Sequence, residues 1–392
     1  MKQVKRVNQV YLDYAAGTPM REGVLKAMAP YFSDCFGNTG SIHQMGDDAR
    51  VVLDNAREQV RVSLGAACCD KIIFTGSGTE SINIALRGVV LDAFFKNGMK
   101  KVHVISSIIE HKAVLETLAD LKAMGYLDVT LVGVDSCGMV KVPEVLGLIQ
   151  KNTVLVSLHY VHNELGVVQR VGLLGKELKR RGVLFHVDAC QAFCYFSCSV
   201  IDLYCDLLTL NSSKVGGPKG VGLLYAREGV GLRSVITGGS QEFGLRAGTE
   251  NVAGIVGFVQ ALQISSRNRV NENIRLRGLQ KYFWKEISSR VSDVKCNSNL
   301  KTGSPHILSI SIRGVEGEHV VRYLSEKGFY VSTGSACTSS EVKVSSSVLA
   351  LGVDPLYAAG TVRFSLGWGT RKSDIRSTVK ALCFVISALK KI

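Results

Sequence analysis

Seven short runs of β-branched and other apolar residues recur in the first part of the chain, and each is followed by a helical or turn segment. They cover residues 71–75, 102–106, 129–134, 153–158, 183–187, 207–210 and 221–225. A run that is apolar on both faces is typical of a strand buried between two layers of helices. The pattern therefore predicts an α/β fold with a seven-stranded, mostly parallel sheet.

The helices expected between these strands show helical spacing of apolar residues. Residues 47–64 repeat such residues along one face, and residues 79–94 begin directly after a glycine turn. Near residue 264 the alternation of short apolar runs and helices ends, and a polar stretch leads into a long helix expected to end near Arg290. The remainder predicts a smaller α+β unit with a strand at 307–312, a helix at 318–327, a strand at 362–366 and a last helix from Ser373.

Composition excludes several classes of protein. Hydrophobic residues make up 46% of the 392 residues and charged residues 20%, which is typical of a globular chain. No apolar run approaches the ~18 residues that a membrane helix needs. Lys2, Lys5 and Arg6 are not followed by the apolar segment of a secretion signal. We therefore expect a cytoplasmic protein that does not enter a membrane.

The cysteines do not resemble a disulfide framework, because their number, 11, is odd and the chain is large. Cys190, Cys194 and Cys198 are spaced four apart, which could align three thiols on one helix face. The spacing also suggests a metal site, but no fourth ligand comes in the usual paired spacing. We predict that most of the cysteines are reduced and structural, and that they bind no metal.

A formal charge of +14 raises the question of a polyanionic partner. The basic residues are scattered in short groups without interleaved aromatic residues, and no nucleic-acid-binding signature is present. The pattern therefore favours a solvated basic surface over direct binding of nucleic acid. Docking of an acidic protein or of tRNA stays open at this point.

Two polar groups close predicted strands. Lys214 follows the strand at 207–210 among small residues and glycines, which allow a flat ligand to approach closely. Partial burial there would make the amine nucleophilic, as a Schiff-base lysine requires. Asp188 closes the strand at 183–187, where a carboxylate can pair with a pyridinium nitrogen or, alternatively, cap the next helix.

Two further segments could carry chemistry. Residues 75–80 form a junction of strand, glycine turn and helix, which favours a phosphate but does not match a nucleotide-binding fingerprint. Cys337 lies in a run of glycine and small hydroxylated residues at 332–340. An exposed thiol in such a segment suits a sulfur carrier, although an incidental surface thiol is the alternative.

Together these segments resemble the cysteine desulfurases of the class V aminotransferase group, in the class with a long loop around the catalytic cysteine. The resemblance follows the family's order through nearly the whole chain. The matching segments are 11–16, 37–38, 41–43, 110–111, 162–166, 186–188 with Gln191, Lys214 with 217–220, 244–251, 334–339 and 363–367.

The resemblance implies the fold-type I architecture of pyridoxal-phosphate-dependent transferases, assembled as a homodimer. It implies a large cofactor-binding domain at 15–264. A small α+β domain, built from residues 1–14 and 265–392, would carry the catalytic-cysteine loop. The implied reaction removes sulfur from L-cysteine and leaves L-alanine. The sulfur would pass to an acceptor protein, either an iron–sulfur scaffold or a tRNA-thiolation enzyme.

The family's residue roles can be carried over to matching positions. Lys214 would hold pyridoxal phosphate as a Schiff base and move the substrate α-proton, and Cys337 would attack the substrate sulfur to form a persulfide. His111 would stack over the ring as an acid/base. The implied substrate contacts are Asn38, Asn163 and Arg363. The implied cofactor contacts are Gly78, Thr79, His111, Asn163, Asp188, Gln191, Asn211, Ser213, Lys214 and, from the other subunit, Thr249.

The chain departs from the family at two places. Ser213 stands where the family usually has a histidine, and Asn211 where it usually has a serine. Neither side chain can carry a charge, so the departure concerns the affinity for the cofactor's phosphate. The chain also ends at Ile392, without the longer tail by which housekeeping members dock their scaffold protein.

Two rival functions follow from the same residues. A selenocysteine lyase or another aminotransferase-type enzyme would use the same lysine chemistry, although plain transamination needs no protein thiol like that of Cys337. A binding module for tRNA or an acidic protein would fit the basic charge, but not the retention of lysine, aspartate, histidine, arginine and cysteine together.

Overall fold

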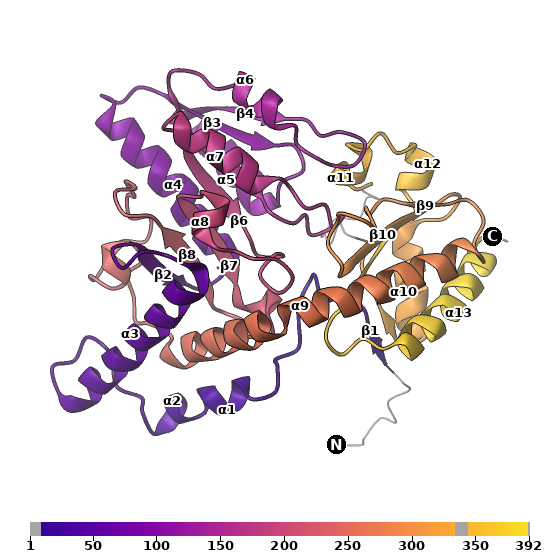
Figure 1. Cartoon of the computed structure of the whole chain (residues 1–392), viewed down its shortest axis with the longest axis horizontal. Helices are drawn as coiled ribbons and strands as arrows, with labels where there is room; N and C mark the ends of the chain where they lie inside the picture. Colours follow the sequence, from indigo (N-terminus) through magenta and orange to yellow (C-terminus); the bar gives the residue numbers. More distant parts are fainter. Residues whose placement is uncertain (1–8, 334–343, 391–392) are drawn as a thin grey trace.

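The computed structural model describes residues 9–333 and 344–390 of the chain. At its centre is a seven-stranded sheet with the strand order β2-β8-β7-β6-β5-β3-β4 (Figure 1). Its strands are β2 (Lys71–Thr75), β3 (Val102–Ser107), β4 (Leu127–Val132), β5 (Thr153–His159), β6 (Leu184–Asp188), β7 (Leu207–Asn211) and β8 (Gly222–Ala226). Strand β8 is antiparallel to both neighbours, and the other adjacent pairs are parallel. The predicted α/β fold is confirmed.

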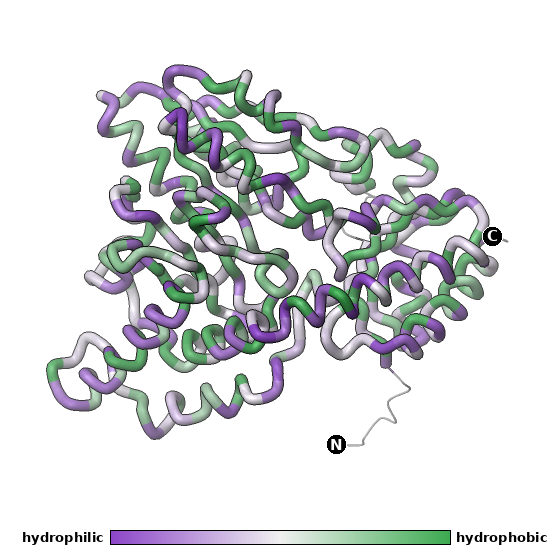
Figure 2. The backbone as a smooth tube through the Cα atoms, viewed as in Figure 1, coloured by the Kyte–Doolittle hydropathy of each residue, from purple (hydrophilic) through white to green (hydrophobic). Residues whose placement is uncertain are grey.

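Helices cover both faces of this sheet, so successive side chains of a strand enter different hydrophobic clusters. Leu207 of β7 packs in the cluster that includes α4 (Gly78–Lys96) and α5 (Lys112–Ala123). The next residue, Leu208, packs in the larger cluster on the side of α7 (Val171–Arg180). In Figure 2 hydrophobic and hydrophilic residues alternate along the outer helices, as expected for helices with one buried face.

One helix, α9 (Val252–Ser288), extends from the large sheet to the second, smaller unit (Figure 1). It has 37 residues and is therefore roughly 55 Å long. The expectation that a polar stretch at 265–273 precedes the helix was wrong, because that stretch lies inside it. Polar residues are tolerated there because the middle of α9 is largely exposed between the two units. The predicted domain division at residue 264 falls within this helix and stays a prediction.

The second unit is built on two small sheets. β10 (Ile307–Ile312) lies between β12 (Thr361–Ser365) and β9 (Val294–Cys296), and both pairings are antiparallel. The N-terminal strand β1 (Val10–Tyr11) pairs in parallel with β11 (Phe329–Tyr330). The first described residues of the chain therefore belong with its C-terminal part, and the chain then crosses to the large sheet.

The remaining helices complete the two units. They are α1 (Val24–Met28), α2 (Pro30–Ser33), α3 (Gln44–Leu64), α6 (Val142–Gly147), α8 (Val200–Leu203), α10 (Gly317–Glu326), α11 (Ser346–Leu349), α12 (Pro355–Ala358) and α13 (Lys372–Leu389), with short 3-10 turns η1 (Ser212–Lys214) and η2 (Glu242–Gly244). Within the ranges 9–333 and 344–390, none of the helices has the length and apolar character needed to cross a bilayer.

A buried ion pair attaches the η2 turn to the edge of the large sheet. The Glu242 carboxylate accepts hydrogen bonds from Arg57 Nη1 at 2.8 Å and Nη2 at 3.0 Å. It also accepts one from the backbone N–H of Phe74 in β2 at 2.9 Å. Because the carboxylate is buried, these donors replace the water that it loses on folding.

We predict that Glu242→Ala lowers the free energy of unfolding by about 3 kcal/mol, because it leaves the Arg57 guanidinium in a largely buried place without its partner. Chemical denaturation followed by circular dichroism measures this change. Glu58→Ala is the matched control, since it removes the exposed partner of Arg61 on the same helix and should leave the midpoint unchanged. Equal midpoints for the two variants would show that the buried pair does not stabilise the fold.

Candidate active site

Asp188 and Lys214 lie at the same edge of the large sheet because their strands are parallel neighbours. Asp188 is the last residue of β6 and is paired in register with Thr209 of β7. Strand β7 continues to Asn211 and leads directly into η1, which ends at Lys214. The Asp188 side chain is buried, and its Oδ1 accepts the backbone N–H of Cys190 at 3.0 Å.

The Lys214 amine is held by the N-terminal segment. Its Nζ donates hydrogen bonds to the carbonyl oxygens of Ala15 at 3.0 Å and Ala16 at 2.6 Å. Burial lowers the pKa of Lys214 from its ordinary value of 10.5. A lowered pKa increases the fraction of neutral amine at neutral pH, and the neutral amine is the nucleophilic form. The sequence-predicted lysine thus has the environment that Schiff-base chemistry requires.

The start of α4 packs tightly against the ends of β6 and β7. A Cβ atom on Gly78 would lie 3.0 Å from Cys190 Sγ and 3.2 Å from Asn211 Cβ, so the backbone approaches closely here. Ser77 caps the helix by accepting the N–H of Glu80 at 3.1 Å. The N–H groups of Gly78 and Thr79 have no hydrogen-bond partner within the described parts of the chain. The N-terminus of this helix therefore presents free donors to an anion beside Lys214.

Asn211 and Ser213, the two departures from the family pattern, are bonded to each other. The backbone N–H and the hydroxyl of Ser213 both donate to Asn211 Oδ1 at 3.2 Å. Both residues lie close to the start of α4, because Asn211 contacts Gly78. The local donors at this end of the site are therefore neutral hydroxyl and amide groups.

Gln191 connects the lysine to a buried histidine that sequence reasoning missed. Its Nε2 donates to the carbonyl oxygen of Ala15 at 2.8 Å, the same oxygen that Lys214 contacts. Its Oε1 lies 3.3 Å from His306 Nε2. Burial lowers the pKa of His306 to about 3, so the ring is neutral, and it stacks on Tyr195 with centroids 4.1 Å apart. Nothing in the local sequence distinguishes His306 from a histidine of the core.

Arg363 and Asn163, both predicted substrate contacts, are in direct contact. Arg363 Nη1 donates to the backbone oxygen of Asn163 at 3.0 Å. Arg363 Nη2 forms an ion pair with Asp13 Oδ1 at 2.7 Å. The Nε atom is buried and has no partner within the described residues. Asp13 belongs to the 11–16 segment that resembles the family, but the sequence did not predict its ion pair with Arg363.

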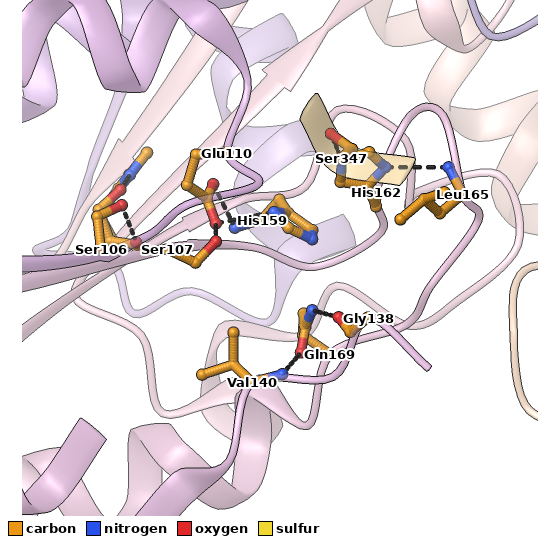
Figure 3. A network of polar contacts seen from close by, with 12 residues as sticks. Ser106, Ser107, Glu110, Gly138, Val140, His159, His162, Leu165, Gln169 and Ser347 are labelled. Atoms are coloured by element: carbon orange, nitrogen blue, oxygen red, sulfur yellow. Dashed lines mark hydrogen bonds and ion pairs between the residues drawn. The ribbon is translucent and has the colours of Figure 1, made fainter. Parts of the chain in front are cut away.

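His111 caps α5 and is exposed, so its ring is accessible from the solvent. Its Nδ1 accepts the backbone N–H of Ala113 at 3.1 Å, which leaves the proton of the neutral ring on Nε2. The preceding residue, Glu110, is buried and accepts bonds from the backbone N–H of His159 at 2.9 Å and from its ring Nδ1 at 2.8 Å (Figure 3). The turn that carries His111 is thus held by the end of β5.

Three predicted site residues do not join this cluster through described contacts. Asn38 is exposed, and its Oδ1 accepts the N–H of Gly40 at 2.8 Å. Thr249 is exposed on the loop before α9. Cys337 lies outside the described residues.

The expectation that Cys190, Cys194 and Cys198 align on one helix face was wrong. The chain is turn and irregular structure from 189 to 199, because it bends there between β6 and α8. Cys194 and Cys198 are packed in the hydrophobic core. Burial raises the pKa of the Cys190 thiol well above its ordinary value and that of Cys198 to about 12. These thiols are therefore protonated at neutral pH and poorly nucleophilic.

Comparisons with known proteins agree with this geometry. Residues 10–377 match the family model of the class V aminotransferases. A cysteine desulfurase IscS of Dictyoglomus turgidum is 40% identical over 384 residues, which cover 98% of this chain and 96% of that protein. The solved structure of a NifS-like protein matches with a TM-score of 0.89 at 34% identity, covering 97% of this chain and 100% of that chain. A structure described as SspA in complex with cysteine matches with a TM-score of 0.80 at 34% identity, covering 91% of this chain and 98% of that chain.

The chain belongs to the class V aminotransferase family, whose members use pyridoxal phosphate. Within that family it is a cysteine desulfurase, like the relatives that it matches over nearly their full length.

The residues at the sheet edge fit this cofactor. Lys214 supplies an amine with a lowered pKa, and Asp188 supplies a buried carboxylate for the pyridine nitrogen. The free N–H groups of Gly78 and Thr79 supply donors for the phosphate. The three kinds of group that the cofactor needs therefore converge on one place.

We predict that Ser213→His slows the loss of pyridoxal phosphate during dialysis by roughly tenfold, because a charge-assisted hydrogen bond is stronger than a neutral one by about 1–1.5 kcal/mol. Absorbance of the retained cofactor measures the loss. Ser213→Asn, which keeps a neutral donor, is the control and should lose cofactor at the wild-type rate. Equal or faster loss from the histidine variant would show that Asn211 and the start of α4 already satisfy the phosphate.

Proposed function

We propose that this enzyme removes sulfur from L-cysteine in the cytoplasm, leaving L-alanine and a persulfide on Cys337. The sulfur then passes to an acceptor protein, either an iron–sulfur scaffold or a tRNA-thiolation enzyme. The observation that carries the proposal is the Lys214 amine, whose pKa is lowered by burial at the same sheet edge as Asp188. The relatives that are named cysteine desulfurases support the choice of reaction.

The sulfur transfer balances without an external oxidant or reductant. The thiolate of Cys337 attacks the sulfur of the substrate, so an S–S bond forms and the substrate's Cβ–S bond breaks. The electron pair of the Cβ–S bond stays with carbon, which takes up a proton and becomes the methyl group of alanine. Sulfur is oxidised to the persulfide level while the carbon is reduced.

Pyridoxal phosphate, when bound, supplies an electron sink for the carbon skeleton of the substrate. Lys214 would hold it covalently and would move the α-proton at its Nζ, whose pKa is lowered by burial. His111 exchanges a proton at Nε2, because its Nδ1 is occupied by the Ala113 N–H. Asp188 would accept the N–H of the protonated pyridine nitrogen, and Gln191, whose Nε2 donates to the Ala15 carbonyl oxygen, would lie near the ring oxygen.

The substrate and the phosphate would be held by different groups of residues. Arg363 binds the substrate carboxylate with the guanidinium positions that Asp13 and Asn163 leave available, and Asn163 and Asn38 contribute amide groups. The phosphate would be held by residues at the start of α4 and the end of β7 together with one residue of the other subunit. These are Gly78, Thr79, Asn211, Ser213 and that subunit's Thr249.

We predict that Cys337→Ser still binds L-cysteine and shifts the cofactor spectrum, but forms no persulfide and turns over little or no alanine. A serine hydroxyl has a pKa far above that of a thiol, so it supplies no comparable nucleophile at neutral pH. Alanine release and trapped persulfide measure the effect. Cys190→Ser is the matched control and should keep near-normal activity. Sulfide release by Cys337→Ser, or its loss in Cys190→Ser, would overturn the assignment of the nucleophile.

We further propose a homodimer, in which the loop of one chain completes the phosphate site of the other. An apolar face around α2 and the following loop is unusually exposed: Phe32 is 63% exposed, Phe36 65% and Ile42 97%. The same loop is tied to the segment that carries Thr249, because Thr39 Oγ1 donates to Glu250 Oε2 at 2.6 Å. The exposed face is therefore continuous with the predicted shared site.

We predict that light scattering gives a mass twice that of the chain, and that Ile42→Asp shifts the protein toward monomer and speeds the loss of cofactor. A charge at a residue that the second copy buries costs several kcal/mol unless it is paired. Ile201→Asp, at an exposed position in α8, is the control and should leave the mass unchanged. A monomeric wild-type protein that retains its cofactor would refute the shared site.

A further inference from the structure

The segment that contains Cys337 lies in the sequence between two described stems, which end at Thr333 and begin at Val344. The first stem is attached to β12, because the backbone N–H and carbonyl groups of Ser332 exchange hydrogen bonds with Arg363 at 3.2 and 2.7 Å. The second stem is attached to the turn that follows β5. There the ring Nε2 of His162 lies 3.2 Å from the hydroxyl oxygen of Ser347 (Figure 3).

The environment of His162 determines which ring nitrogen carries the proton. Its Nδ1 accepts the backbone N–H groups of Glu164 at 3.1 Å and Leu165 at 3.0 Å. The proton of the neutral ring is therefore on Nε2, whose neighbouring acceptors are the Ser347 hydroxyl oxygen and the backbone carbonyl oxygen of Ile109. Burial lowers the pKa of His162 well below its ordinary value, so the ring stays neutral at neutral pH and keeps this orientation.

Apolar packing joins the same two segments independently of the hydrogen bond. Leu165 and Val167, from the turn after β5, pack with Val348, Leu351 and Ala358 in a hydrophobic cluster separate from the two large ones. Glu164, in the same turn, is buried, and burial raises its pKa, an effect that the Ser345 hydroxyl and the charge of Arg363 oppose. The second stem is thus held by its own small core.

The other side of His162 faces the groups that handle the substrate. Its ring lies edge-on to that of His159, with centroids 5.0 Å apart and an interplanar angle of 73°. His159 in turn holds Glu110, the neighbour of His111, through the two bonds described above. The residue after His162 is Asn163, whose backbone oxygen binds Arg363. The turn that carries His162 and Asn163 therefore contacts His159, which holds the neighbour of His111. It also contacts Arg363 and the second stem.

We propose that His162 is a positioning residue for sulfur transfer, which acts by joining Ser347 of α11 to the turn whose next residue, Asn163, binds Arg363. The proposal rests on the proposed function, because it concerns the delivery of the Cys337 thiol. His162 touches neither substrate nor thiol in this role. Loss of its hydrogen bond should therefore slow the transfer step and leave the binding of cofactor and substrate unchanged.

The first test is Ser347→Ala, which removes the hydroxyl without altering the histidine. We expect the single-turnover rate of persulfide formation to fall roughly 2- to 10-fold, the range that follows from losing one neutral hydrogen bond. Cofactor content and the spectral dissociation constant for L-cysteine should not change. Ser346→Ala, at an exposed position of the same helix, is the matched control, and Ser347→Thr should restore the rate by restoring a hydroxyl.

The second test asks whether the two residues act through one contact. His162→Leu should slow persulfide formation, His162→Gln should partly restore it by supplying an N–H donor, and His162→Leu combined with Ser347→Ala should be no slower than His162→Leu alone. A Ser347→Ala rate equal to that of Ser346→Ala, or weakened binding of L-cysteine, would overturn the proposal. Absence of persulfide in the wild-type protein would overturn the proposed function itself, so the two failures are distinguishable.

Discussion

The buried guanidinium of Arg363 is the constraint on which the arrangement of the site depends. A buried charge is tolerated only when it is paired and hydrogen-bonded, and removal of one partner costs about 3–5 kcal/mol. Arg363 is 3% exposed, and its partners are Asp13 of the N-terminal segment and the backbone of Asn163 in the turn that follows β5. The pair with Asp13 brings the N-terminal segment back to β12. The same segment then presents the carbonyl groups that hold the Lys214 amine.

Buried histidines support this arrangement as neutral, oriented donors. Burial lowers the pKa of His186 to about 4 and that of His306 to about 3, so neither ring gains a charge near neutral pH. Each ring is held between two hydroxyl or amide partners, as His186 is between Ser157 and Thr209. Histidine here behaves as a rigid link between strands and loops. The exposed His111 is different, because its Nδ1 caps α5 and its ring is not enclosed by such partners.

Much of the fold could be predicted from local pattern, because parallel strands buried on both faces must be apolar throughout. All seven strands of the large sheet were found within a few residues of the predicted runs. The continuity of α9 could not be predicted, since a polar stretch ends a helix in one context and lies in the exposed middle of a helix in another. The turn at Cys190, Cys194 and Cys198 was missed for a related reason: spacing of four is compatible with a helix but does not require one.

The sequence by itself determined the α/β class and predicted candidate site residues at strand ends, because hydrophobic period and short-range motifs are properties of neighbouring residues. It identified Lys214 and Asp188 on those grounds, and the parallel pairing of β6 with β7 places both at one sheet edge. Only the tertiary structure decided the partners of Arg363, the link from Gln191 to His306 and the contact of His162 with Ser347. Each of these contacts joins residues more than 100 positions apart in the chain. The Arg363 pair also supplies a partner for a buried charge. No local sequence pattern encodes pairings of this kind.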